Sequence, residues 1–152
     1  MRYTQSQIRQ LLDIPVETFR TWRDAVPALR RHRGHGPTFA PGDVIALAVL
    51  TEAVRLFGVR VGSIGVRLDE LFATCNVMSW LALESCVVMI EAERVRVIPA
   101  DDARRVATEQ ATLVVPCAPI VDRLRGSLLA SEPVDRQGQL QFPPTRIAGA
   151  KL

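Results

Sequence analysis

The sequence predicts a mainly α-helical fold that ends in a small unit of both strands and helices. Over about the first 75 residues, apolar side chains recur at spacings of three and four, the period of a helix with one buried face. After residue 76 they gather in short runs rich in Val and Ile, which are typical of strands. Because 48% of the residues are hydrophobic, the chain can bury a core of its own.

Two short helices are expected at the start of the chain. The first covers residues 4–12, where Thr4 and Gln7 have the spacing of a capping box. Residues 13–15, Asp-Ile-Pro, form a tight break, and a second helix is expected over residues 16–24. A short helix, a three-residue turn and another short helix make up the helix-turn-helix pattern.

A long helix is expected after an irregular segment. Residues 25–40 contain several Pro and Gly residues, which predicts a loop or a hairpin and not a helix. Pro41 suits the first turn of the long helix, and Gly58 suits its end. A fourth helix is expected from Val61 to Phe72, despite two glycines in its sequence.

The remaining residues are predicted to run strand, strand, helix, strand, helix. These elements are expected at residues 86–90, 94–98, 101–110, 112–116 and 119–130. The chain therefore divides into a first unit, residues 1–75, and a second, α+β unit, residues 76–131. Residues 132–152 are rich in Pro and Gly, offer few core candidates and are expected to form a flexible tail.

Positive charge is concentrated in the first half of the chain. Residues 1–67 carry ten Arg and five acidic residues, a net charge of +5, whereas residues 68–152 carry nine basic and eleven acidic residues, a net charge of −2. The asymmetry is expected if the first half meets a polyanion. Eighteen of the nineteen basic residues are Arg, which indicates a GC-rich bacterial genome; such a bias explains the choice of Arg over Lys, but not the asymmetry.

The second short helix has a polar outer face. At about 100° per residue, Thr18 and Thr21 point outward and Arg20 flanks them. Val16 and Phe19 are expected on the inner face, toward the core. Short polar side chains edged by Arg suit entry into a DNA major groove, because Thr and Arg contact base edges or phosphates.

Two residues of the same helix have a second interpretation each. Trp22 either packs inside the core of the first three helices or contacts the DNA backbone, and both alternatives stay open. Arg23, like Arg20, either contacts DNA or is a solvated charge, and we favour DNA contact for both.

The loop that follows is basic and contains glycines. Arg31 and Arg33 are expected to contact phosphate, with a merely solvated loop as the alternative. His32 and His35 have metal-like spacing, but no carboxylate or Cys lies beside them in the sequence. Protonation near phosphate is therefore the preferred interpretation of the two histidines.

Three stretches in order carry a family resemblance. They are "YTQSQIRQLLDIPVETFRTW", the basic "RHRGHGPTF" and "PGDVIALAVLTEAVRLFGV". With them, residues 3–64 resemble the winged helix-turn-helix domain of MerR-type transcriptional regulators. The resemblance implies a recognition helix at residues 16–24, a wing near residues 30–38 and a phosphate contact just before the fourth helix. By position it implies roles in DNA binding for Thr18, Arg20, Thr21, Trp22, Arg31, Arg33 and Arg60, to which the residues themselves add Arg23 and His35.

The chain also departs from the family pattern. Pro15 stands where a Ser or Thr N-cap is usual, and Thr21 where an aromatic residue is common. Pro37 and Thr38 replace basic residues of the second wing strand. The long coiled-coil helix that joins typical members into dimers is missing, so the resemblance implies neither a mode of dimerisation nor a sensed signal.

No enzyme chemistry is predicted. Asp101 and Asp102 are adjacent at a helix start and point about 100° apart, so capping explains them better than catalysis. Cys75, Cys86 and Cys117 are widely spaced and odd in number, which implies neither a disulfide framework nor a zinc site. Buried structural thiols are the preferred interpretation, with a redox sensor as the alternative. We expect no cofactor and no metal.

The sequence therefore predicts a bacterial, cytoplasmic transcription regulator that binds specific double-stranded DNA sequences at promoters, as a homodimer. No apolar run reaches the roughly 18 residues of a membrane span, and the start of the chain has no apolar signal-peptide core. Residues 76–131 are the candidate unit for dimerisation, for a partner or for sensing. Besides DNA and a second copy, RNA polymerase or another regulatory protein is the partner that this function implies. The alternatives are an architectural or excision factor of a mobile element, a ligand- or redox-responsive sensor with DNA binding as its output, and a role in protein interactions alone.

Overall fold

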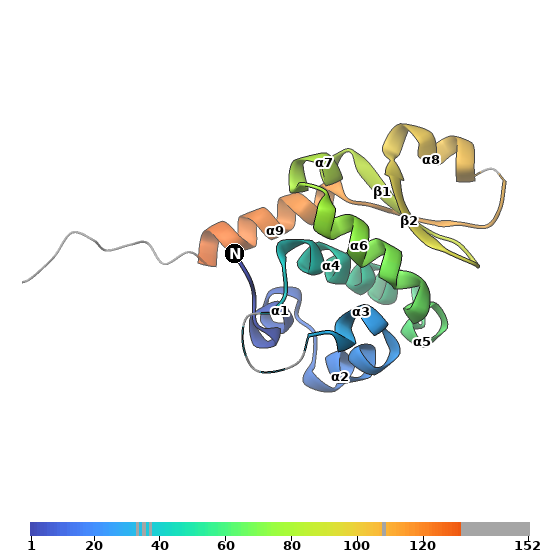
Figure 1. Cartoon of the computed structure of the whole chain (residues 1–152). Helices are drawn as coiled ribbons and strands as arrows, with labels where there is room; N and C mark the ends of the chain where they lie inside the picture. Colours follow the sequence, from blue (N-terminus) through green and yellow to red (C-terminus); the bar gives the residue numbers. More distant parts are fainter. Residues whose placement is uncertain (33, 35, 37, 108, 132–152) are drawn as a thin grey trace, which may run out of the picture.

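A long central helix, α4 (Pro41–Phe57), organises the fold. In the computed structural model, which describes residues 1–131 apart from 33, 35, 37 and 108, most of the chain is helical and three strands form a small antiparallel sheet. Figure 1 shows α4 between two groups of elements, with short helices on one side and the sheet on the other. None of the helices in this described part is long and apolar enough to cross a membrane.

The elements of the two groups follow each other along the chain. The first group contains α1 (Gln5–Leu12), α2 (Val16–Ala25), α3 (Pro27–Arg30) and α5 (Val61–Ile64). A 3-10 turn, η1 (Gly65–Arg67), leads from α5 into α6 (Leu68–Val77), which lies alongside α4. The second group contains α7 (Trp80–Glu84), β1 (Cys86–Ile90), β2 (Val95–Pro99), α8 (Ala100–Ala107), β3 (Leu113–Pro116) and α9 (Ala118–Ser131).

The capping box predicted for the first helix is confirmed. The Thr4 hydroxyl accepts a hydrogen bond from the Gln7 amide (3.2 Å), and the Gln7 side chain accepts one from the Thr4 amide (2.8 Å), which completes the capping box of α1. α1 ends at Asp13, whose left-handed backbone (φ 51°) turns the chain. Only Asp13, the buried Ile14 and Pro15 separate α1 from α2.

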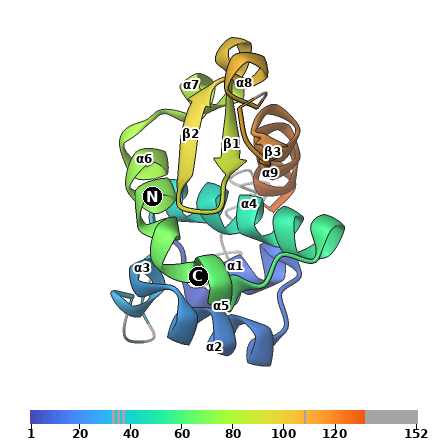
Figure 2. The same cartoon turned by 90° about the vertical axis from the view of Figure 1, so that its right-hand side faces the viewer.

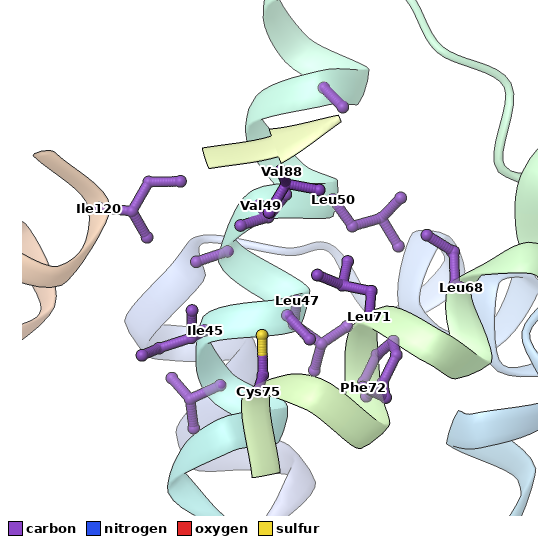
Figure 3. Packing of buried hydrophobic residues seen from close by; sticks show 14 of the residues in the cluster. Ile45, Leu47, Val49, Leu50, Leu68, Leu71, Phe72, Cys75, Val88 and Ile120 are labelled. Carbon is purple, nitrogen blue, oxygen red and sulfur yellow. The ribbon is translucent and has the colours of Figure 1, made fainter. Parts of the chain in front are cut away.

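α4 is enclosed on almost every side. Every residue from Gly42 to Thr51 is buried, as expected of a helix that is apolar around most of its circumference. Pro41 occupies its first turn, and Gly58 ends it in the left-handed conformation (φ 64°), so both predicted boundaries are confirmed. Its side chains, among them Ile45, Leu47, Val49 and Leu50, belong to one buried cluster with side chains of α6, β1 and α9, some of which Figure 3 labels.

The sheet has the strand order β2-β1-β3, with both neighbours antiparallel to β1. Because side chains alternate between the two faces of a strand, Val88 and Val115 point toward the helices, whereas Val87 and Met89 point outward and meet Ala103 of α8. Figure 2 shows α8 beyond the sheet and α4 below it. The order of elements predicted for the second unit is thus confirmed.

One hydrophobic cluster runs through both predicted units. It extends from Ile8 in α1 through α4 and α6 to Leu124 in α9. The change of sequence pattern near residue 76 therefore marks a change of secondary structure, and side-chain packing continues across it.

β3 forms a free edge of the sheet. The Cys117 amide donates to the Cys86 carbonyl (3.1 Å). In an antiparallel pair the main-chain groups of every second residue point toward the partner strand, so Val115 and Leu113 also turn theirs toward β1. Val114 and Pro116 therefore present their main chain outward, and Pro116 has no N–H to donate. A proline at this position weakens the edge as a template for a further strand.

The prediction for residues 25–40 was wrong in one part. A short helix, α3, forms at Pro27–Arg30, because proline fits the first helical position and Ala28 and Leu29 are buried against the core. Arg30 holds this helix to the preceding one, since its Nε donates to the Asp24 carbonyl (3.1 Å).

The fourth predicted helix is interrupted. It is divided into α5, η1 and α6 at Gly65, where the backbone packs against the end of α2: a Cβ at Gly65 would lie 2.2 Å from the Ala25 carbonyl oxygen. α7 was not predicted; Ser79 caps it by accepting a hydrogen bond from the Ala82 amide (3.1 Å). Val16, expected on an inner face, is 51% exposed, because it lies in the first turn of α2 beyond the reach of the core.

Candidate nucleic-acid interface

The inner face of α2 is fixed by aromatic side chains. Phe19 is fully buried and meets the ring of Phe39 edge to face, with 6.1 Å between the ring centroids. Trp22, one helical turn further on, is 6% exposed and belongs to the same core. Core packing of the Trp22 ring is therefore confirmed, and contact of its indole N–H with DNA stays a prediction.

The outer face of α2 is polar and open. Arg20 and Thr21 are exposed, and Thr18 and Arg23 are half-buried. The Thr21 hydroxyl donates to the Glu17 carbonyl (3.0 Å), which leaves its oxygen lone pairs and methyl group facing outward. These four side chains thus lie together on one helix, as the sequence predicted.

Arg60 extends this surface. Arg60 is exposed and directly precedes α5, which packs against α2 at the same end of the molecule (Figures 1 and 2). Within the described residues, Arg20, Arg23 and Arg60 make no hydrogen bond or ion pair through their side chains. Three arginines without a partner, gathered around one polar helix, can bind an anionic ligand without first breaking an internal contact. We call Arg20, Arg23 and Arg60 the unpaired arginines.

Arg31 is engaged, but weakly. Its guanidinium lies 3.5 Å from a carboxylate oxygen of Asp69 in α6, and the two side chains are 74% and 38% exposed. An exposed pair of this kind contributes at most about 1 kcal/mol, so a phosphate could replace the carboxylate. Arg33 and His35, the other two candidates in this segment, lie outside the described residues.

A buried carboxylate lies beneath the same segment. Asp43, in the first turn of α4, is 3% exposed and accepts hydrogen bonds from the Ala40 amide and from the Asn76 side chain, both at 2.7 Å. His32 Nε2 is 3.5 Å from the carboxylate, and the His32 ring stacks on Phe39 (4.2 Å between centroids, 20° between planes). This group was not predicted. An acidic residue at the third helical position was a signal for Asp43, whereas Asn76 lies 33 residues away and gave none.

The three cysteines are free and buried. Burial raises the pKa of Cys75 to about 12 and that of Cys117 to about 11, and it also raises the pKa of Cys86. The thiolate is the reactive form, so these environments suit structural thiols better than a redox sensor.

A shallow apolar groove lies on another face. It has a volume of about 210 Å³ and runs between the end of α4, β3 and the start of α9, with Leu56, Phe57 and Pro119 in its lining. That volume is below the roughly 300–1,000 Å³ of most small-molecule sites. In the part of the chain that the structure describes, no three His, Cys, Asp or Glu side chains gather as they would around a metal ion.

No protein-family model, curated protein or solved structure matches the chain. The chemistry of the candidate interface therefore follows from its own side chains.

Proposed function

We propose that the chain is a transcription regulator that binds specific sequences of double-stranded DNA through α2. The observation that carries this proposal is the set of unpaired arginines around the polar face of α2. Arginine side chains left exposed and without internal partners do little for folding, whereas they suit a phosphate backbone or a guanine edge.

In this proposal α1 and α2 form a helix-turn-helix, and α2 enters the major groove. The groove of B-DNA is about 12 Å wide and admits a helix. Thr18 and Thr21 would meet base edges, and Arg20 either a guanine or a phosphate. Arg60 and Arg31 would hold the flanking backbone, where contacts fix position and not sequence.

A dimer follows from the size of the reading surface. One short helix reaches few base pairs, so specific binding needs a second copy on a repeated or palindromic site. In this proposal the second copy docks through the second unit, which lies away from α2 and leaves the reading face open.

The experiment is a titration with duplex DNA from the region upstream of the protein's own gene, alongside an unrelated duplex, over a range of salt. Arg20→Ala with Arg60→Ala should weaken binding by more than about tenfold and lower the salt slope by about 0.9 for each phosphate that is no longer neutralised. The matched control is Arg104→Ala, which removes another exposed arginine without a described side-chain partner, on α8. Equal binding by the double variant and the control would contradict the proposal. Bending of the bound duplex without an effect on transcription would favour the architectural alternative.

A further inference from the structure

We propose that His32 is a positioning residue for DNA binding, the central member of a clamp formed with Phe39 and Asp43. This inference rests on the proposed function and deepens it. The clamp would fix the backbone at His32 and at Phe39, and with it the place of the neighbouring Arg31.

The first half of the clamp is an aromatic stack. His32 and Phe39 flank the segment on either side, and their rings lie nearly parallel with centroids 4.2 Å apart. Phe39 is itself held in place, because its amide and carbonyl form two hydrogen bonds with Tyr3, of 3.1 and 2.8 Å. The two ends of the segment are therefore brought together over a fixed residue.

The second half of the clamp is the buried carboxylate. A buried charge is costly unless it is hydrogen-bonded, and Asp43 meets this condition with the Ala40 amide and the Asn76 side chain. His32 approaches the same carboxylate at 3.5 Å. The Asp43 carboxylate thus contacts both His32, which precedes residues 33–38 in the sequence, and Ala40, which follows them.

The clamp is also held relative to the reading helix. Phe39 contacts Phe19 of α2, and Asn76 of α6 donates both to Asp43 and to the Phe72 carbonyl (2.9 Å). The position of His32, and of Arg31 beside it, is therefore fixed relative to α2. Ordering of a binding group before the ligand arrives lowers the entropy lost on binding, which is the physical reason for such a clamp.

The test is a set of His32 variants in two backgrounds, the natural chain and a variant in which Arg31 and Arg33, its neighbours in sequence, are both Ala. His32→Ala should weaken duplex binding about fivefold to tenfold and lower the salt slope by about one in the natural background. It should change neither quantity in the Arg31→Ala, Arg33→Ala background, because Arg31, the group that the clamp positions, is already gone.

Two further variants separate positioning from stability. His32→Phe keeps the stack but not the donor, and it should restore part of the affinity even if His32→Ala folds poorly. Val88→Ala, which removes buried side-chain volume from β1 far from the clamp, should lower the melting temperature and leave the salt slope unchanged.

The outcomes distinguish the two proposals. An unchanged salt slope for His32→Ala, or the same loss of affinity in both backgrounds, would overturn the clamp while leaving α2 as the DNA-binding element. Failure of the natural protein to bind any duplex at about 50 mM salt would overturn the proposed function, and the clamp with it.

Discussion

Arginine has different roles at the two ends of the molecule, the first end around α2 and the second end around the sheet and α9. Around α2, the unpaired arginines are exposed and have no partner in the described part of the chain. At the sheet, Glu91 accepts hydrogen bonds from Arg94 (2.6 Å) and Arg96 (2.8 Å), and Arg123 of α9 pairs with Glu52 of α4 (2.5 Å). Apart from Arg104 on α8, the described arginines of the second end have partners within the protein, whereas the first end leaves three of its arginines available to a ligand. Net charge alone would not have separated these roles.

The largest expected effect is on the reaction rate of the buried cysteines. It tests whether the sheet end and the shared core offer a reactive thiol. A rise in thiol pKa from 9.0 to about 12, as for Cys75, lowers the thiolate fraction about a thousandfold at pH 8. The folded protein should therefore react with a disulfide reagent orders of magnitude more slowly than the unfolded protein, as followed by absorbance. Fast reaction of Cys75 or Cys117 in the folded protein would restore the redox alternative.

The next effect concerns the packing of the backbone at Gly65 against the end of α2. Gly65→Ala should destabilise the protein by about 3 kcal/mol, because its Cβ would meet the Ala25 backbone, which cannot move aside as a side chain can. Chemical denaturation measures the change. The control is Gly62→Ala, where a Cβ meets no atom within 4 Å and the helix should gain up to about 1 kcal/mol. Similar stabilities for the two variants would show that the backbone at Gly65 does not pack tightly against the end of α2.

A smaller effect is expected on stability at low pH, through the pairing of Glu91 with Arg94 and Arg96 at the sheet. Hydrogen bonds from Arg96 and Arg94 lower the pKa of Glu91 from 4.5 to about 2. Since the folded-state pKa is the lower one, this contribution to stability is fully present above pH 4.5 and is lost as the pH falls toward 2. Denaturation between pH 6 and pH 2 should show that loss in the natural protein, and Glu91→Gln should lack it. A Glu93→Gln variant, altered at an exposed neighbour, should keep it.

The smallest effect is expected at Arg31, which is paired with Asp69 and is also a candidate DNA contact. Asp69→Asn breaks an exposed pair with Arg31 and should change stability by less than about 1 kcal/mol. DNA affinity should rise two- to threefold at about 50 mM salt, because Arg31 no longer has to exchange partners. Weaker binding by Asp69→Asn in a salt titration would mean that the carboxylate holds Arg31 in its binding position.

The long and well-marked elements could be predicted from sequence, and the short ones could not. Thr4, Pro41 and Gly58 act on neighbours only a few residues away, so local patterns located the ends of α1 and α4. α3 and α7 have four and five residues, too few for a helical period to be visible. The break at Gly65 depends on a contact with Ala25, which no local pattern reveals.

In the candidate site, too, features set by local sequence could be predicted, and features set by contacts between distant residues could not. The outward position of Thr21 and Arg20 is a matter of helix geometry and was predicted. Trp22 lies three residues after Phe19 and so shares its buried face, which helix geometry could have indicated. The Asp43 cluster joins three segments far apart in sequence, so only the folded chain brings it together.

Pro116 has a consequence for how copies of this chain can meet. Sheets of separate molecules can merge through their edges, and the same growth, once started, continues into fibres. With no N–H at Pro116, the outer edge of β3 lacks one rung of the ladder that such growth requires. Two copies that meet at the outer edge of β3 would therefore have to do so through side chains and not through a continuous ladder of main-chain hydrogen bonds.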